Sequence, residues 1–249
     1  MDIWAEADGA RHIAPVAGIL LRMVESQEQV ATTRLVDALD KQQVLEALLE
    51  GTKPAWRAGT ERLHYLLATP FRYPPLRYGS RFGRRSEPAL FYGALSLPTL
   101  LAEAAYYRFV FWHGMTVPPP TPLGTQHSVF ETPYASTRGI RLQYAPFDGW
   151  QAALTDPADY RDTQVLGTAM RAAGVAAFEY RSARDPARGL NVALFDPEAL
   201  TQTRPSYIEQ WLAETTADRV RYVSQGAAQA FDFPLGLFAI DGRLPQPAF

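Results

Sequence analysis

Residues 69–111 read TPFRYPPLRYGSRFGRRSEPALFYGALSLPTLLAEAAYYRFVF. This stretch combines five arginines in its first half, several aromatic residues, and one glutamate, Glu103, inside a predicted helix. Arginine guanidinium groups bind phosphate oxygens in a bidentate way, tyrosine rings stack on flat heterocycles, and a carboxylate stabilises positive charge that develops on a sugar. The mixture therefore predicts a ligand that carries both phosphate and an aromatic base, and NAD is the candidate.

The composition is that of a globular chain with one large core. The 249 residues are 47% hydrophobic and 20% charged, which favours one domain with an appendage. The net charge of −2 indicates no general affinity for nucleic acid or membranes. The absence of cysteine excludes disulfides, thiolate metal sites and cysteine nucleophiles, and it fits a reducing compartment. The apolar run at 16–21 is too short for a signal peptide or a membrane span, so we expect a cytoplasmic protein.

The N-terminal region, residues 1–58, is expected to be helical. Apolar residues recur there at helical spacings, with polar residues between them. These residues are Val30, Leu35, Val36, Leu39, Val44, Leu45, Leu48 and Leu49. Asp40 followed by Gln43 resembles a capping box that opens the second helix of a helical hairpin. We interpret this region as a packing subdomain that precedes a second domain over residues 59–249.

From Leu63 onward the pattern changes to short apolar segments between turns, which is typical of strands. The expected strands cover residues 63–68, 89–94, 140–145, 174–180 and 190–196. Helices are expected at residues 98–112, 159–173 and 207–215. The proline-rich residues 116–125 should form an exposed connection, since proline cannot continue a helix or a central strand. The fold class that this pattern predicts is α+β.

The motifs of several enzyme classes are absent. No expected strand is followed by G-x-G-x-x-G or by a Walker-type glycine loop, which disfavours a Rossmann domain. The four histidines are far apart and lack the spacing of a zinc site, so we expect no metal. No G-x-S-x-G elbow occurs, which argues against a hydrolase of that type.

Glu103 is the sharpest single signal for chemistry. Its neighbours on the same face of the expected helix are Leu100, Tyr107 and Val110, so the carboxylate lies on an apolar and aromatic stripe. Burial of an unpaired carboxylate there would cost roughly several kcal/mol, so a tyrosine hydroxyl, an arginine or a cationic ligand must offset it. The alternative to a catalytic role is a structural ion pair with one of three arginines, Arg77, Arg81 or Arg108.

Two further clusters are candidates for ligand binding. The arginines Arg72, Arg77, Arg81, Arg84 and Arg85 lie in a segment interrupted by prolines and glycines. Such a loop can wrap a pyrophosphate, and the alternative is a solvated basic loop that meets an acidic partner. Ser182 directly follows an expected strand and could bind a carboxamide or a ribose, although serine also forms turns with its own backbone. Asn191 is a weaker candidate that shapes the start of the next strand.

Three blocks in this order resemble the RES domain family, which is named for its arginine, glutamate and serine. The blocks are FRYPPLRYGSRFG, ALFYGALSLPTLLAEAAYYR and AAFEYRSARDPARGLNVALFDPEAL, and the resemblance extends over roughly residues 61–200. It implies a bacterial toxin of a type II toxin–antitoxin system that consumes NAD as a substrate without a metal. It also implies a fold similar to the diphtheria-toxin-like ADP-ribosyltransferases, with a mixed core of two small β-sheets, flanking helices and the N-terminal helical region in addition.

The resemblance assigns roles residue by residue. Arg72 looks like the family arginine that contacts NAD, and Arg81 looks like the arginine of a glycine-x-arginine-aromatic motif. Tyr92 matches the strand tyrosine, Glu103 the glutamate and Ser182 the serine. The chain departs from the commoner pattern in two ways: Phe82 stands in place of a tryptophan, and the interval from Arg72 to Arg81 is compressed. Arg77 is therefore an alternative to either arginine as the residue that contacts NAD. The catalytic set implied is Glu103, Arg72 and Ser182, with NAD also contacted by Arg77, Arg81 and Tyr92.

Three functions are compatible with these residues. The first is a toxin that transfers ADP-ribose from NAD to a protein, and the second is an NAD glycohydrolase or phosphorylase. The third is a non-catalytic module that binds an acidic partner through the basic loop, with Glu103 in a buried ion pair. The resemblance further implies a cognate Xre-like antitoxin that covers the NAD site, whereas neither nucleic acid nor a membrane is expected as a direct partner.

Overall fold

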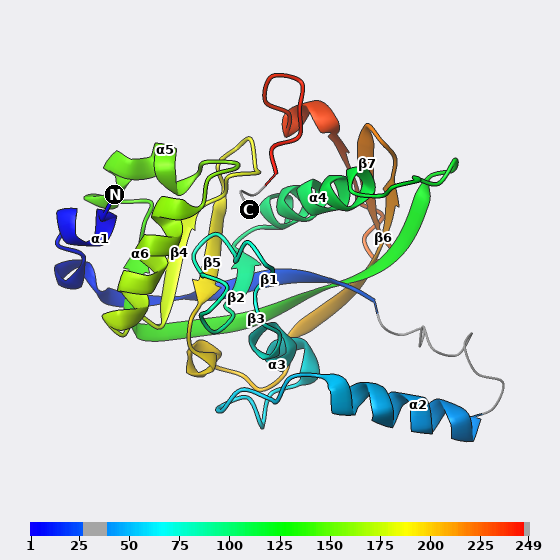
Figure 1. Ribbon diagram of the computed structural model, residues 1–249, viewed down its shortest axis with the longest axis horizontal. Helices are drawn as coiled ribbons and strands as arrows, with labels where there is room; N and C mark the ends of the chain where they lie inside the picture. Colours follow the sequence, from blue (N-terminus) through cyan, green and yellow to red (C-terminus); the bar gives the residue numbers. More distant parts are fainter. Residues whose placement is uncertain (27–38, 247–249) are drawn as a thin grey trace.

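The computed structural model describes residues 1–26 and 39–246 of the chain (Figure 1). The α-helices are α1 Ile3–Glu6, α2 Leu39–Thr52, α3 Tyr65–Arg72, α4 Leu97–His113, α5 Gln151–Leu154 and α6 Arg161–Ala172. The strands are β1 Ala14–Glu25, β2 Phe91–Ala94, β3 Leu123–Arg141, β4 Ala177–Arg181, β5 Leu190–Leu194, β6 Tyr207–Thr215, β7 Arg219–Ser224 and β8 Ala230–Pro234. Short 3-10 turns cover Gly9–His12, Phe147–Trp150, Pro197–Ala199 and Leu235–Leu237.

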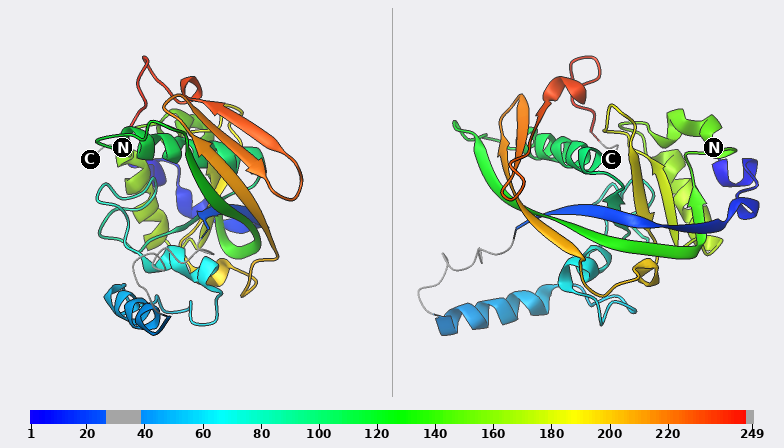
Figure 2. Two further views of the ribbon diagram at one scale, coloured as in Figure 1. Left: turned by 90° about the vertical axis from the view of Figure 1, so that its right-hand side faces the viewer. Right: turned by 180° about the vertical axis from the view of Figure 1, so that it is seen from behind.

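The strands form one sheet in the order β1-β2-β5-β4-β3-β6-β7-β8. Every pairing is antiparallel except that of β3 with β4. Because β1 also pairs with β3, the series β1, β2, β5, β4 and β3 closes into a ring, and β6, β7 and β8 extend it as a meander. The expected mixture of helices and strands is confirmed, but the expectation of two small sheets is wrong. The 12-residue β1 and the 19-residue β3 pair along most of their length and connect both ends of the molecule (Figure 2).

Helices cover the sheet on different sides (Figures 1 and 2). Helix α4 packs over β6, β7 and β8 around Trp211 and Tyr222. Helices α1, α5 and α6 pack against β4 and β5, with Phe82 and Phe178 at the centre of that cluster. Helix α3 packs on the opposite side of β2, where Phe71 meets Phe91. The short strand β2 therefore lies where these layers meet, directly before α4 in the chain.

The N-terminal region differs from the helical prediction over residues 1–58. Residues 14–25 form β1, which is a full member of the sheet, because long-range pairing with β3 satisfies its backbone groups. The expected second helix of the hairpin is confirmed as α2, whereas the expected first helix falls within residues 27–38, which lie outside the described residues. The sheet therefore contains strands from both sides of the predicted domain boundary between residues 58 and 59.

Local predictions elsewhere were confirmed where the pattern was strong. Helices α4 and α6 and strands β2, β4 and β5 occupy the predicted segments, and Gly174 after α6 has the predicted left-handed φ of +74°. Residues 63–68 were predicted as a strand, but they enter helix α3, which His64 caps through its side chain. Residues 207–215 were predicted as a helix and form β6, in which Trp211 and Ala213 face the core in strand alternation. The predicted strand at 140–145 is the end of β3 only.

Candidate functional site

Helix α4 begins next to the end of β2 and carries Glu103 on its second turn. Ser96 caps the helix by accepting the backbone N–H of Thr99, and Pro98 occupies the first turn, where a missing N–H costs nothing. The antiparallel pairing of β2 with β5 brings Asn191 opposite Ala94, just before the helix begins. The pairing of β4 with β5 then places Tyr180, two residues before Ser182, opposite Asn191. Glu103, Ser182 and Asn191 thus come from three different elements to one point.

The Glu103 carboxylate is held by two hydrogen-bond donors. Ser182 Oγ donates to Glu103 Oε1 at 2.6 Å, and Asn191 Nδ2 donates to the same oxygen at 2.7 Å. Both donors are neutral, so neither of them forms an ion pair with the carboxylate. The bonds both end on Oε1, so within the described residues Oε2 is the oxygen left to a ligand.

Ser182 contacts Glu103 through its hydroxyl group but does not line the cavity that is described next. Its side chain is 0% exposed, and its hydroxyl oxygen accepts the backbone N–H groups of Arg184 at 3.0 Å and Asp185 at 2.9 Å. With its oxygen occupied by these two donors, the single hydroxyl proton goes to Glu103. Ser182 is therefore connected to the cavity through Glu103, and its predicted contact with a substrate stays a prediction.

A cavity of about 450 Å³ opens beside Glu103. This volume lies within the range of roughly 300–1,000 Å³ that is common for small-molecule sites. Its wall includes Glu103, Asn191, Tyr92, Arg22, Arg81 and Arg184. One carboxylate and three guanidinium groups therefore share a cavity that is otherwise lined largely by aromatic and apolar side chains.

Arg81 is a buried cation on the wall of the cavity. The side chain is 8% exposed, and Nη1 donates to the carbonyl oxygens of Leu154 at 3.3 Å and Asp156 at 2.8 Å. Its guanidinium carbon lies 4.5 Å from the ring centre of Tyr160. Nη2 is buried and has no hydrogen-bond partner among the described residues. Arg81 lines the cavity, so its positive charge suits an anionic ligand.

Arg184 supplies a second fixed cation to the same wall. Its Nη2 donates to the carbonyl oxygen of Pro157 at 2.6 Å and to the hydroxyl of Tyr160 at 3.1 Å. The guanidinium carbon lies 3.4 Å from the ring centre of Tyr106 on α4. Tyr160 thus joins Arg81 and Arg184, one through its ring face and one through its hydroxyl.

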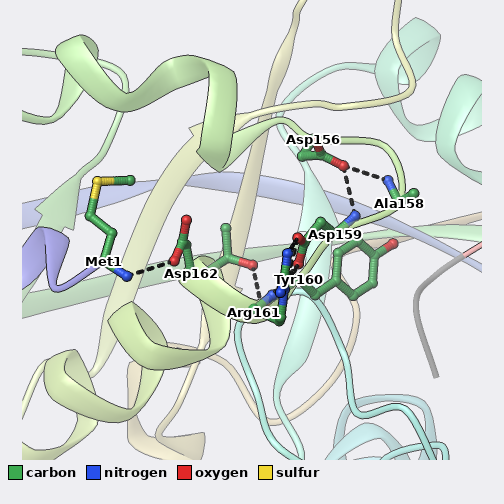
Figure 3. A network of polar contacts seen from close by, with 8 residues as sticks. Met1, Asp156, Ala158, Asp159, Tyr160, Arg161 and Asp162 are labelled. Atoms are coloured by element: carbon green, nitrogen blue, oxygen red, sulfur yellow. Dashed lines mark hydrogen bonds and ion pairs between the residues drawn. The ribbon is translucent and has the colours of Figure 1, made fainter.

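The segment that holds Tyr160 is itself braced by polar contacts (Figure 3). Asp156 Oδ1 accepts the backbone N–H groups of Ala158 at 2.8 Å and Asp159 at 2.7 Å. Asp159 pairs with Arg161 at the start of α6, and this hydrogen-bonded pair lowers the pKa of Asp159 to about 2. The turn therefore keeps its shape, which fixes the carbonyl oxygens that orient Arg81 and Arg184.

Arg22 reaches the cavity from β1. Its Nη1 donates to the carbonyl oxygen of Tyr92 at 2.6 Å, and its guanidinium carbon lies 5.1 Å from the ring centre of Phe91. Burial lowers the pKa of Arg22 to about 10, so it remains a cation at neutral pH. Its Nε is buried without a hydrogen-bond partner among the described residues.

Tyr92 lines the cavity as a neutral phenol. Its hydroxyl lies 2.9 Å from Ser80 Oγ and accepts the backbone N–H of Phe82 at 3.1 Å. Burial raises the pKa of Tyr92 to about 12. Phe82, which stands in place of the tryptophan of the commoner pattern, is fully buried against Phe178 and Tyr180. The backbone at Phe82 thereby anchors Tyr92.

Arg72 and Arg77 do not line this cavity. Arg72 Nε donates to the carbonyl oxygen of Pro54 at 2.6 Å, Nη1 donates to Glu50 at 2.7 Å, and the guanidinium stacks on Trp56 at 4.0 Å. These contacts attach α2 and the following loop to α3. Arg77 is exposed and absent from the cavity wall. The structure therefore does not bring Arg72 or Arg77 to the cavity beside Glu103, and their assignment to NAD binding stays a prediction.

Sequence reasoning missed Arg22 and Arg184 as site residues and undervalued Asn191. Arg22 lies in a segment that was predicted as helical, and only its pairing in the sheet brings it to the cavity. A polar residue that interrupts the apolar run of β5, such as Asn191, is a signal that could have been given more weight. Arg184 belongs to the motif that contains Ser182, but only the fold determines that its side chain lines the cavity.

A cavity whose wall carries one carboxylate and three guanidinium groups has the chemistry to bind an anionic organic molecule. The model of the RES domain matches residues 54–226, and the chain belongs to this family. Arg22 and β1 lie outside the matched residues. No curated protein matches the chain. Among the described residues no helix is long and apolar enough to cross a membrane.

Proposed function

We propose that this protein is the toxin of a type II toxin–antitoxin system, and that it cleaves the nicotinamide–ribose bond of NAD and transfers ADP-ribose to a protein. Membership of the RES domain family supports an NAD-related role. The observation that carries the proposal is the position of Glu103, whose Oε1 is fixed by Ser182 and Asn191 at the wall of a cavity with Arg22, Arg81 and Arg184. The fold we propose is of the ADP-ribosyltransferase type.

Cleavage of the nicotinamide–ribose bond requires no proton transfer to the leaving group. The bond between the ribose C1 and the ring nitrogen of nicotinamide breaks, and its electron pair goes to that nitrogen, so the cationic ring leaves as a neutral molecule. No general acid is required. The sugar becomes oxocarbenium-like, and the acceptor then attacks C1 and loses a proton. Glu103 stabilises the developing positive charge, or fixes the ribose hydroxyls, more strongly in the transition state than in the ground state.

The three arginines are suited to the pyrophosphate of NAD. Arg22, Arg81 and Arg184 all line the cavity, and Tyr160 and Tyr106 hold Arg184 in place. A diphosphate bound here would accept charge-assisted hydrogen bonds from these guanidinium groups. Tyr92, neutral and anchored, would border the nicotinamide. In this proposal Arg22 takes the part that the sequence had suggested for Arg72.

The acceptor decides between transfer and simple degradation of NAD. Helix α2 exposes Val44, Leu48 and Leu49, with exposures of 60%, 65% and 40%. Adjacent apolar side chains on an exposed helix favour contact with another protein, and this observation favours a protein acceptor over water or phosphate. A cognate Xre-like antitoxin that covers the cavity is part of the same proposal.

The test uses purified protein and its Glu103→Gln variant with NAD labelled in the adenylate and a cell lysate. Released nicotinamide and label fixed on protein are followed together. We expect nicotinamide release and one labelled protein with the wild type only. Nicotinamide release without labelled protein would instead establish an NAD glycohydrolase or phosphorylase, and no release in antitoxin-free protein would favour a non-catalytic binding module.

A further inference from the structure

We infer that Asn191 is a positioning residue, which sets the orientation of the Glu103 carboxylate by donating to Oε1 so that Oε2 faces the ligand. The inference rests on the proposed function where it concerns turnover. It assigns Asn191 no role as a ligand contact. The geometry itself, the bond of 2.7 Å from Asn191 Nδ2 to Glu103 Oε1, does not depend on which ligand occupies the cavity.

The backbone of Asn191 is held from both sides. β5 pairs antiparallel with β2 and with β4, and in these ladders Asn191 lies opposite Ala94 and Tyr180. The residue is 3% exposed, so its amide has little freedom to turn toward solvent. A donor carried by a doubly paired strand is a more rigid reference than one carried by a loop. Asn191 therefore fixes the carboxylate relative to the sheet.

Ser182 alone is insufficient to set the carboxylate plane. A single hydrogen bond of 2.6 Å leaves the carboxyl group free to rotate about that bond, whereas a second donor on the same oxygen removes this freedom. Ser182 sits on the turn before Gly189, and Asp185 ties this turn to α4 by accepting the hydroxyl of Thr99 at 2.8 Å. The two donors thus belong to two separate elements: Ser182 lies in the turn, and Asn191 lies in the sheet.

The amide is the side chain that this position requires. An aspartate of the same shape would present an acceptor to an acceptor and place a second negative charge beside Glu103. An alanine would remove the donor without adding a charge. Other charged and titratable groups around the carboxylate include Arg22 on β1, Arg81 before β2, Tyr107 on α4, Tyr160 before α6, Tyr180 on β4 and Arg184 after β4. All of these groups remain in both variants, so the difference between wild type and Asn191→Ala reports the loss of the amide, and the difference between the two variants reports the added charge.

The first experiment compares NAD cleavage by wild type, Asn191→Ala and Asn191→Asp. We expect kcat to fall about tenfold or more in Asn191→Ala, with KM changed by less than about threefold, because the orientation rather than the ligand contact is lost. Asn191→Asp should be less active than Asn191→Ala despite its matching shape. Val192→Ala is the control for damage to β5, since Val192 is fully buried on the α3 side of the sheet, and it should keep kcat while lowering stability. A raised KM with unchanged kcat would overturn the inference, because it would make Asn191 a ligand contact.

The second experiment needs no turnover. The Glu103 carboxyl resonance of ligand-free protein labelled with 13C-glutamate is assigned by its loss in Glu103→Gln and is compared between wild type, Asn191→Ala and Asn191→Asp under one set of conditions. Asn191 Nδ2 donates to Glu103 Oε1, so loss of this donor should shift the resonance in both variants, whereas Val192→Ala should leave it in place. An unchanged resonance in both Asn191 variants would overturn the inference. If the wild type does not cleave NAD, the proposed function fails, and this comparison still decides the role of Asn191.

Discussion

Arg22 on β1 donates a hydrogen bond of 2.6 Å to the main-chain carbonyl oxygen of Tyr92 on β2. The two strands share a single registered pair, Leu21 with Ala94, so this side-chain bond supplements a short ladder. Tyr92 belongs to the part of the chain matched by the RES domain, whereas Arg22 does not. The cavity wall is thus completed by a strand that precedes the matched region.

Replacement of Arg22 by methionine should weaken ligand binding more than it weakens the fold. We expect the dissociation constant for NAD to rise about tenfold, since one charge-assisted contact to phosphate is lost. The melting temperature of the ligand-free protein should fall little, because the replacement also removes the cost of burying a guanidinium whose Nε has no partner in the part of the chain that the structure describes. Calorimetric titration and thermal unfolding check the two parts. Unchanged NAD affinity would remove Arg22 from the binding site.

Glu103→Gln should retain the fold and lose turnover. Glutamine keeps an oxygen that can accept from Ser182 and Asn191, so the local hydrogen bonds survive, but the negative charge is gone. We expect nicotinamide release to fall on the order of a hundredfold or more, the size typical of one strong transition-state contact. Steady-state kinetics with a circular dichroism control measure this. Turnover equal to that of wild type would refute the role of Glu103.

Arg72 and Arg81 form a matched pair for testing which arginines serve the ligand. Arg81→Gln removes a buried cation that lines the cavity and should lower NAD affinity by about tenfold or more. Arg72→Gln should leave affinity and turnover within about twofold, because its contacts are with Glu50, Pro54 and Trp56. The same binding assay applied to both variants gives the comparison. The reverse order of effects would restore the assignment that the family pattern suggested.

The pH dependence of stability should contain a contribution from His127. Burial, together with the positive charge of Arg108, lowers the pKa of His127 from 6.5 to about 4. Between these two pH values the unfolded chain binds a proton that the folded chain does not, so the free energy of unfolding falls as pH drops from 6.5 toward 4. The loss should reach roughly 3 kcal/mol at most. In His127→Gln, urea unfolding across this window should be less dependent on pH, and an identical slope would contradict the assignment.

Local sequence signals predicted the central elements of the site well. The helix of Glu103 has a serine cap and a proline in its first turn, and β4 and β5 are short apolar runs bounded by turns. The strand β6 and the helix α3 were assigned to the wrong class, because a short apolar segment carries no strong periodicity and its neighbours in space decide its structure. The pairing of β6 with β3 and β7 is such a long-range effect.

The sequence by itself determined that a glutamate on an apolar helix face and a serine after a buried strand belong to one family pattern, because motif order and local periodicity are properties of the chain alone. Only the tertiary structure decided which arginines accompany Glu103. Long, flexible side chains in a loop rich in proline and glycine have no period that reveals their direction. The contact of Arg22 with Tyr92 joins residues 70 positions apart, and it exists only because β1 is drawn into the sheet by its pairing with β3.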